Sequence, residues 1–483
     1  MILDQIAHHA ARQGAKTALI HNGQSLSYRA FAQLIEQNRR IFAQQNLPVG
    51  STAVILIQNM AQAWLALLGL RALGLTTICL FRPDPAIRLR NVSCLVTNAQ
   101  EYNPALAQAH MVPNAQLIVI PMDAYSMQSA ARINRFASSA TAPNGHICLS
   151  TGTTGVPKRL LYAQATEAAA IKALQKHFKV GTDSIYNGLN RALYTSSVYK
   201  NFLATWDAGG CAVIDQTPQP FQSCRTGAQH VSVPQAILRG FLRSAPAPVG
   251  NADAMYRIGG GLYFDEVVAA KKHLSPLIKN SYASTEIILN PLENWVETQD
   301  DVIWLRRTGN NELEIVDGED RRVPPGHEGF LRIKLHHFDC HEYLDDAESS
   351  ARVFRDGYFY PGDLAIERND GRIRILGRAS EVIVVKTAKF AVGPIERDLR
   401  HALKARVVAL FARRNLESED ELVVVIEGDR SPATSEVRAA LRDFALFEKV
   451  HILCFHTFPA TPNGKVNRLA LRERAFKQVD QLK

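Results

Sequence analysis

Short apolar runs alternate with segments of helical periodicity along much of the chain. Residues 54–57 and 117–120 are continuous apolar runs, the pattern of strands that are buried on both faces of a sheet. Residues 61–73 have helical periodicity, and the apolar stretch 63–81 is interrupted by an arginine and two glycines. That stretch predicts a buried helix followed by a strand, and not a membrane span. The alternation predicts the α/β class, with β-sheets flanked by helices in several layers.

The pattern also suggests where the chain divides into domains. A chain of 483 residues is too long for a single hydrophobic core, so more than one domain is expected. Residues 372–375 alternate arginine and isoleucine, which predicts a strand. Beyond residue 378, the segment 381–386 is followed by an expected helix near 394–403 and expected strands near 407–411 and 422–426. We therefore expect a large N-terminal domain over residues 1–378 and a small α+β domain over residues 379–483.

A loop rich in glycine and hydroxyl groups follows the apolar run 147–149. It reads Ser150-Thr151-Gly152-Thr153-Thr154-Gly155-Val156-Pro157-Lys158. Glycines let backbone N–H groups approach an anion closely, and hydroxyls and a lysine add donors and charge. Pro157 stands where a P-loop has its second glycine, so the spacing excludes that motif. Taken alone, the loop fits either a polyphosphate site or an ordinary turn.

Further motifs follow this loop in order. They are Tyr282-Ala283-Ser284-Thr285-Glu286, Asp356-Gly357-Tyr358-Phe359-Tyr360-Pro361-Gly362-Asp363, Gly377-Arg378 and Thr461-Pro462-Asn463-Gly464-Lys465-Val466-Asn467-Arg468. Together with the loop, the set resembles the signature of the class I adenylate-forming superfamily, which contains acyl- and aryl-CoA synthetases, adenylation domains of nonribosomal peptide synthetases, and luciferase. The resemblance covers nearly the whole chain, because residues 26–28 and 61–74 also look like the family's N-terminal segments.

The resemblance implies a two-step reaction on a hinged fold. A carboxylate attacks the α-phosphorus of ATP, giving an acyl adenylate and pyrophosphate, and a nucleophile then takes the acyl group. The implied cofactors are ATP and Mg²⁺, with coenzyme A or a phosphopantetheine carrier as co-substrate. The small C-terminal domain would move about a hinge near Arg378 and would carry a catalytic lysine.

The resemblance also implies which residues hold the nucleotide. The β- and γ-phosphates would bind Thr151, Gly152, Thr153, Thr154, Gly155 and Lys158, and the adenine would lie against Tyr282 and the loop Gly259, Gly260 and Gly261. Asp363 would accept hydrogen bonds from both ribose hydroxyls, a role that suits the two oxygens of a carboxylate. Arg378 would contact the ribose from its other side.

Three residues would act on the reacting phosphate by the same resemblance. Thr285 would contact the α-phosphate and Glu286 would be the protein ligand of Mg²⁺, a cation that usually takes few protein ligands. Lys465 would bridge the carboxylate and the phosphate and stabilise the transition state of adenylation.

Several positions depart from the family's pattern. Arg159, Ala283, Pro361 and Ser380 replace residues that are usual in the motifs, but none of these changes removes a charged catalytic group. Thr387 stands where the family commonly has a glycine that faces the pantetheine tunnel. The adenylation step is therefore better supported than the transfer to a thiol.

The substrate class is indicated by Tyr194-Thr195-Ser196-Ser197-Val198-Tyr199-Lys200. This segment aligns with one in amino-acid-activating domains, where an aspartate pairs with the α-ammonium of the substrate. Thr195 stands at that position and cannot neutralise a cation, and a buried unpaired ammonium would cost several kcal/mol. We expect an aryl or acyl acid without an α-amine, contacted by Tyr194, Thr195, Ser197, Tyr199 and Lys200. Lys200 either pairs with a second acidic group or faces solvent.

Composition adds a few limits. The net charge is +9, from 55 basic and 46 acidic residues, which fits either a solvated basic surface or anionic partners such as ATP, coenzyme A or an acidic carrier protein. No basic run has interleaved aromatics, so nucleic-acid binding is not indicated. Seven cysteines without paired spacing, and an N-terminus without signal-peptide features, favour the cytoplasm.

Three functions remain open from the sequence. The first is a ligase that joins an aryl or acyl acid to coenzyme A or to a carrier protein. The second is adenylation followed by transfer to an amine, and its motivation is Thr387. The third is a non-catalytic relative that binds a nucleotide or a partner protein. The presence together of Lys158, Glu286, Asp363 and Lys465 argues against the third.

Overall fold

The structure, a computed structural model, consists of two compact units. It describes residues 2–80, 87, 89–103, 115–121, 144–150, 157–189, 193, 196–214, 227–244, 253–259, 261–309, 311–385, 388–414, 420–429, 432–441, 449–461 and 465–481. The first unit contains Met1–Val302 and Leu335–Phe359, and the second contains Ile303–Lys334 and Tyr360–Lys483. These limits follow from the contacts between residues and differ from the boundary expected after Arg378. The expected boundary describes a small domain that moves about a hinge, and it stays a prediction.

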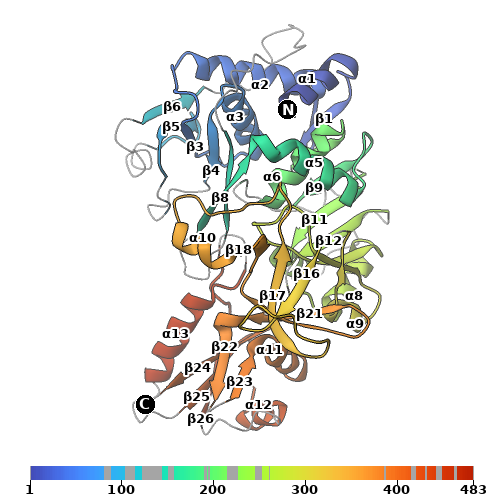
Figure 1. Ribbon diagram of the computed structural model, residues 1–483, viewed down its shortest axis with the longest axis vertical. Helices are drawn as coiled ribbons and strands as arrows, with labels where there is room; N and C mark the ends of the chain where they lie inside the picture. The colour runs from blue at the N-terminus through green and yellow to red at the C-terminus, as the bar shows by residue number, and fades with distance from the viewer. Residues whose placement is uncertain are drawn as a thin grey trace. The chain divides into compact units, whose positions relative to one another are not determined.

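The first unit alternates strands and helices (Figure 1). Its helices are α1 (Ile2–Arg12), α2 (Tyr28–Ala43), α3 (Met60–Ala72), α5 (Gln164–Phe178), α6 (Ser196–Asp207), α7 (Gln235–Arg243), α8 (Phe264–His273) and α10 (Ala347–Val353), and α9 (Gln299–Ile303) ends at the limit of the unit. Its strands are β1 (Thr17–His21), β2 (Gln24–Ser27), β3 (Thr52–Ile55), β4 (Thr76–Cys79), β5 (Val92–Asn98), β6 (Gln116–Ile120), β7 (Gly145–Ser150), β8 (Lys158–Ala163), β9 (Ile185–Gly188), β10 (Cys211–Ile214), β11 (His230–Pro234), β12 (Met255–Gly259), β13 (Ile278–Tyr282), β14 (Leu292–Trp295), β18 (Phe354–Arg355) and β19 (Tyr358–Phe359).

Two mainly parallel sheets organise the first unit. One has the order β6-β5-β3-β4-β7-β8, with only the β7–β8 pair antiparallel. The other runs β14-β13-β12-β11-β9-β10-β1-β2 within this unit, and it is parallel from β13 to β1. Parallel strands need crossover connections, which explains the helices between consecutive strands.

The core of the first unit joins both sheets through the helices. One buried cluster contains residues of β3, of β10 and of helices α1, α2, α3, α5 and α6. Every residue of α3 except Gln62 is buried, as expected for a helix that is apolar all round. Trp64 of α3 packs edge-on against Trp206 of α6, with ring centroids 4.9 Å apart. The predicted buried helix and the strand that follows it, β4, are confirmed.

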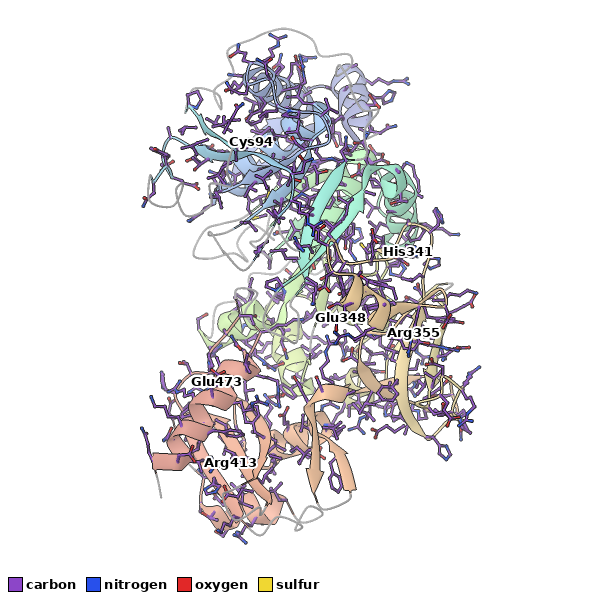
Figure 2. The ribbon with its side chains drawn as sticks, turned by 60° about the vertical axis from the view of Figure 1, so that its left-hand side comes forward. Cys94, His341, Glu348, Arg355, Arg413 and Glu473 are labelled. Carbon is purple, nitrogen blue, oxygen red and sulfur yellow. The ribbon has the colours of Figure 1, made fainter. Side chains whose placement is uncertain are left out.

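The second unit contains smaller sheets. Its strands are β15 (Arg306–Arg307), β16 (Leu313–Val316), β17 (Glu328–Lys334), β20 (Asp363–Glu367), β21 (Ile373–Arg378), β22 (Val382–Val385), β23 (Ala388–Ala391), β24 (Val407–Arg414), β25 (Asp420–Glu427) and β26 (Lys449–Phe455), and its helices are α11 (Val392–Ala402), α12 (Thr434–Ala440) and α13 (Arg468–Gln481). Strands β17, β20 and β21 form an antiparallel sheet that β16 extends. The order β24-β25-β26 forms a separate sheet, on which Arg413 lies, while Glu473 lies on α13 (Figure 2).

The elements expected near residue 378 and beyond are present. The alternation at 372–375 forms part of β21, and the helix near 394–403 is α11. The α/β class with several sheets and flanking helices is confirmed. Within the described residues, no helix is long and apolar enough to cross a membrane.

Candidate active site

The predicted adenine-binding residues lie at the ends of two neighbouring strands. Strands β12 and β13 are parallel, with Gly259 opposite Ser281, so Gly259 and Tyr282 lie at the carboxyl ends of adjacent strands. In open α/β sheets, ligands bind outside such carboxyl ends. A Cβ on Gly261 would meet none of the described atoms within 4 Å, so the fold itself leaves space there. Gly260 lies outside the described residues.

The predicted magnesium ligand, Glu286, is buried and held by hydroxyl groups. Its exposed fraction is 6%, its Oε1 accepts a 2.8 Å hydrogen bond from Tyr343 Oη, and its Oε2 accepts one from Ser284 Oγ. Its carbonyl oxygen accepts from the N–H of Cys340 at 3.1 Å. The carbonyl oxygen of Thr285 accepts a 2.5 Å hydrogen bond from Tyr162 Oη, so hydrogen bonds fix both predicted phosphate-side residues.

This carboxylate fits the chemistry of a nucleotide-bound magnesium ion. A buried anion is stable only when it is paired or bound to a metal, and no ion pair joins Glu286 to a described cation. The described residues contain no cluster of three or more carboxylate, histidine or cysteine ligands. A single carboxylate suits Mg²⁺, because that ion keeps several waters and takes most of its other ligands from phosphates.

The predicted phosphate lysine is paired inside the first unit. Lys158 begins β8, and its Nζ donates to Asp346 Oδ2 at 2.7 Å and to Ser349 Oγ at 2.8 Å. The hydrogen bond from Lys158 lowers the pKa of Asp346 to about 2. Asp346 also caps α10 by accepting from the N–H of Ser349 at 3.0 Å. The loop residues Thr151, Gly152, Thr153, Thr154 and Gly155 lie outside the described residues.

Arg159, one of the departures from the family's pattern, contacts the same segment as Lys158. Its Nη2 donates to the carbonyl of Leu344 at 2.9 Å, and its Nη1 lies 3.4 Å from Asp345 Oδ2. The adjacent cations of β8 are therefore both held by residues 344–346.

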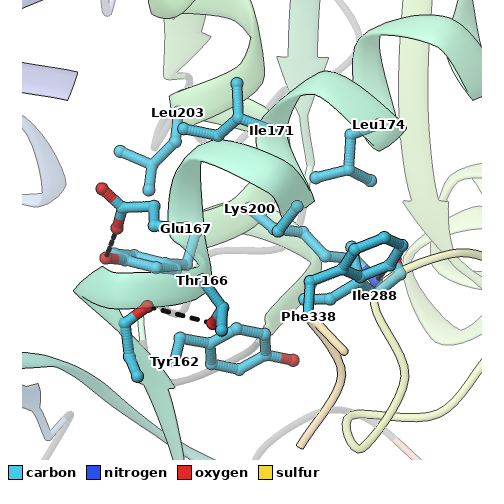
Figure 3. Close-up of a pocket in the computed structure, with 12 residues that line it drawn as sticks. Tyr162, Thr166, Glu167, Ile171, Leu174, Lys200, Leu203, Ile288 and Phe338 are labelled. Atoms are coloured by element: carbon cyan, nitrogen blue, oxygen red, sulfur yellow. Dashed lines mark hydrogen bonds between the residues drawn. The ribbon is translucent and has the colours of Figure 1, made fainter. Parts of the chain in front are cut away.

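Helix α6 places two of the predicted substrate residues against a small cavity. Tyr199 and Lys200 line it together with Tyr162, Glu167, Ile288 and Phe338, among others (Figure 3). The cavity is small, with a volume of about 20 Å³. Ser197 lies on the same helix, and Tyr194 and Thr195 lie outside the described residues.

The hydroxyl of Tyr199 belongs to a buried charged network. It accepts a 2.6 Å hydrogen bond from Arg71 Nη1 and donates to Glu167 Oε2 at 3.0 Å, and Arg71 also pairs with Glu167 at 2.6 Å. The ring of His146 stacks on Tyr199 with centroids 4.3 Å apart. Burial lowers the pKa of His146 to about 3, so this ring is neutral near neutral pH.

Lys200 does not face solvent, so that alternative is wrong. Its exposed fraction is 5%, and its Nζ donates to the carbonyl oxygens of Ile288 at 2.5 Å and Ile287 at 3.2 Å. A lysine surrounded by apolar neighbours in the sequence can fold inward when backbone acceptors receive its ammonium group.

The second unit holds the predicted ribose residues side by side. Asp363 begins β20 and Arg378 ends β21, and the two are direct cross-strand partners. Arg378 Nε lies 3.2 Å from Asp363 Oδ1, and Arg378 Nη1 also donates to the carbonyl of Pro361. Asp363 is 6% exposed, so its carboxylate is fixed by its neighbours.

Lys465, the predicted catalytic lysine, is exposed and belongs to the second unit. The N–H of Thr461 donates to the carbonyl of Lys465 at 2.7 Å, and the N–H of Lys465 donates to Thr461 Oγ1 at 3.2 Å. These two hydrogen bonds fix the backbone at Lys465. Residues 462–464 lie outside the described part of the chain.

Sequence reasoning missed the partners of these residues. Asp346 and Tyr343, which hold Lys158 and Glu286, belong to no motif that we identified. One signal was available for the first: aspartate is a preferred residue at the position directly before a helix, where its carboxylate caps the first turn. Nothing in the sequence pattern pointed to Tyr343.

The comparisons identify the class of protein. The chain belongs to the family of AMP-binding enzymes, whose family model matches residues 6–337. This confirms the resemblance to the class I adenylate-forming superfamily. The chain is therefore an adenylate-forming enzyme.

Two curated relatives match almost the whole chain. The chain is 23% identical to the vibriobactin-specific 2,3-dihydroxybenzoate-AMP ligase of Vibrio cholerae, over 98% of this chain and 93% of that protein. It is 24% identical to surfactin synthase subunit 2 of Bacillus subtilis over 96% of this chain, but it spans only 13% of that subunit's length.

Solved structures share the fold over almost the whole chain. The amide bond synthetase McbA from Marinactinospora thermotolerans has a TM-score of 0.79 at 17% identity, covering 98% of this chain and 99% of that one. ATP-bound MatB from Rhodopseudomonas palustris has a TM-score of 0.80 at 17% identity, covering 98% of this chain and 99% of that one.

Proposed function

We propose that the protein activates a carboxylic acid without an α-amine as its acyl adenylate and then transfers the acyl group to a thiol of coenzyme A or of a carrier protein. The observation that carries this proposal is the segment after β13, where the buried Glu286 carboxylate follows Tyr282 at the carboxyl end of a parallel strand. Its sequence, in a member of the AMP-binding enzyme family, matches the family's nucleotide motif.

The residue roles follow the chemistry of the first step. Tyr282 and the glycines after β12 hold adenine, Asp363 and Arg378 hold the ribose, and Thr285 contacts the α-phosphate. Glu286 is the protein ligand of Mg²⁺, which, when bound, neutralises charge on the phosphates. The Lys158 ammonium leaves Asp346 for a phosphate oxygen, an exchange of one anionic partner for another.

Lys465 is proposed to neutralise charge that develops between the attacking carboxylate and the α-phosphate. Lys465 is an exposed residue whose backbone pairs with that of Thr461. We propose that residues 379–483 form the smaller domain that carries this lysine and moves about Arg378.

The proposed acid is an aryl or acyl acid. Thr195 offers no carboxylate to an α-ammonium, and the described residues of α6 that were predicted to contact the acid, Ser197, Tyr199 and Lys200, offer none either. The relative from Vibrio cholerae is named for an aryl acid, 2,3-dihydroxybenzoate, and matches this chain over nearly its full length. Aryl acids are therefore the first substrates to test.

Transfer to an amine is the second candidate for the last step. Thr387 replaces the glycine that the family commonly has beside the pantetheine tunnel. One of the similar structures is named as an amide bond synthetase. The proposed carrier or coenzyme A partner and an amine acceptor can be compared directly in one assay.

The test is acid-dependent release of pyrophosphate from ATP, measured with a panel of aryl, acyl and amino acids. The wild-type protein should release pyrophosphate with at least one aryl or acyl acid, and Glu286→Gln should reduce that release strongly. Coenzyme A, a phosphopantetheinylated carrier protein and amines are then added separately, and the product is identified by mass spectrometry. Absence of acid-dependent release with every acid would reject the proposed function.

A further inference from the structure

Lys200 extends from α6 to the chain segment that follows the proposed magnesium ligand. In Figure 3 its side chain points away from Glu167 and toward Ile288 and Phe338. Its Nζ donates to the carbonyl oxygens of Ile288 and Ile287 at 2.5 Å and 3.2 Å, and the side chain is buried. Two of the three ammonium donors are therefore committed to the backbone directly after Glu286.

Asp339 holds the same backbone from a different part of the chain. Its Oδ1 accepts from the N–H of Ile288 at 2.7 Å, and its Oδ2 accepts from the N–H of His336 at 2.8 Å. The N–H of Ile288 is thus bound by the carboxylate of Asp339, and the carbonyl oxygen of Ile288 is bound by the ammonium of Lys200. Burial lowers the pKa of Lys200 to about 8, and the negative charge of Asp339, which is 6% exposed, opposes that shift.

The Asp339 segment also reaches Glu286 directly. The N–H of Cys340 donates to the Glu286 carbonyl at 3.1 Å, and Tyr343 Oη donates to its Oε1 at 2.8 Å. Both backbone and carboxylate of Glu286 are therefore held by residues 339–343, and the next two carbonyls are held by Lys200. Because a metal ligand must be aimed within a small angle, such outer contacts commonly change metal affinity 10- to 100-fold.

We propose that Lys200, together with Asp339, is a positioning residue that fixes the backbone after Glu286 and so aims the Glu286 carboxylate at the magnesium of the nucleotide. This inference rests on the proposed function of Glu286. It assigns Lys200 to the main chain instead of to the acid, because its Nζ donates to two backbone carbonyl oxygens.

The direct test is metal binding without turnover. Mn²⁺ is titrated into each protein in the presence of α,β-methylene ATP, and the free ion is measured by electron paramagnetic resonance. Lys200→Met should weaken Mn²⁺ binding about tenfold, toward the value for Glu286→Gln. The matched control is Lys279→Met, which removes a partly buried ammonium from β13. Lys279 Nζ pairs with Glu293 Oε2 at 3.2 Å. That control should bind Mn²⁺ like the wild-type protein.

Steady-state kinetics separates positioning from substrate contact. If Lys200 acts through Glu286, Lys200→Met should raise the Mg²⁺ concentration needed for half-maximal pyrophosphate release and leave the KM for the acid within about twofold. A raised KM for the acid with unchanged Mn²⁺ binding would assign Lys200 to the substrate and overturn the inference. Equal Mn²⁺ affinity in Lys200→Met and the wild-type protein would also overturn it.

A second variant guards against failure to fold. Asp339→Asn keeps the size of the side chain but offers only one carbonyl oxygen to the two N–H groups of Ile288 and His336. It should weaken Mn²⁺ binding in the same direction as Lys200→Met. The proposed function is rejected by different results. These are wild-type Mn²⁺ binding by Glu286→Gln, or no pyrophosphate release with any acid.

Discussion

Asp363 is a carboxylate held in position by an arginine of the neighbouring strand. Asp363 on β20 lies opposite Arg378 on the adjacent strand β21, with Arg378 Nε 3.2 Å from Asp363 Oδ1, and its side chain is buried. Asp363→Ala should raise the KM for ATP about tenfold or more, because a hydrogen bond to a charged group is worth about 1.5–3 kcal/mol. Binding of ATP by isothermal calorimetry would check it, and an unchanged affinity would mean that the ribose lies elsewhere.

Lys465 is the residue whose removal should affect the rate more than binding. Lys465→Ala should lower acid-dependent pyrophosphate release about 100-fold or more while ATP affinity stays within a few-fold, because the charge is needed chiefly in the transition state. Lys477→Ala, in helix α13 of the same unit, is the control and should leave the rate unchanged. Near-normal adenylation by Lys465→Ala would refute the proposed role.

At the scale of residues, the sequence could name the motif side chains but not what holds them. Lys158 and Glu286 lie in short local motifs, so their type and spacing identify them. Their partners Asp346 and Tyr343 lie 188 and 57 residues away along the chain. No periodicity connects such distant positions, because only the folded sheet brings them together. The burial of Lys200 was missed for the same reason.

Among the elements, the helices and strands with continuous apolar patterns were predictable, while the order of strands was not. Helix α3 is buried except at Gln62, and its sequence is apolar except at Gln62 and Arg71, so the expected helix matches it closely. Strand β3 lies between β4 and β5, a placement that depends on crossover connections instead of local pattern.

Strand β7 carries a buried histidine that should make stability depend on pH. His146 is fully buried, its Nδ1 lies 3.0 Å from Thr77 Oγ1, and burial lowers its pKa to about 3. Below about pH 6.5 the unfolded chain binds a proton that the folded protein refuses, so the free energy of unfolding falls as pH decreases. The contribution of this group should be about 1.4 kcal/mol per pH unit between roughly pH 6 and pH 4.

Urea unfolding at a series of pH values checks this contribution. His146→Gln should lose stability less steeply on acidification than the wild-type protein does. The control His8→Gln removes an exposed histidine of α1 and should keep the wild-type slope. Identical slopes for all three proteins would contradict a buried neutral ring at position 146.

At the scale of the whole molecule, the proposed substrate class predicts which acids the enzyme will not activate. A panel of proteinogenic amino acids should give little or no exchange of labelled pyrophosphate into ATP, because an unpaired buried ammonium costs several kcal/mol. At least one aryl or acyl acid should support exchange. Robust exchange with any α-amino acid would contradict the proposal and would require a carboxylate elsewhere in the acid site.

The network of Tyr199, Arg71 and Glu167 has a consequence for protein engineering. Replacing Tyr199 by a small residue would remove a hydroxyl from a buried ion pair and leave a cavity, and each effect costs about 1–3 kcal/mol or more. Libraries that vary Tyr199, Arg71 or Glu167 one position at a time should therefore yield mostly unstable proteins. Variants of the proposed acid site are therefore better sought by randomising Arg71 and Glu167 together with Tyr199, so that both charges are removed in the same step.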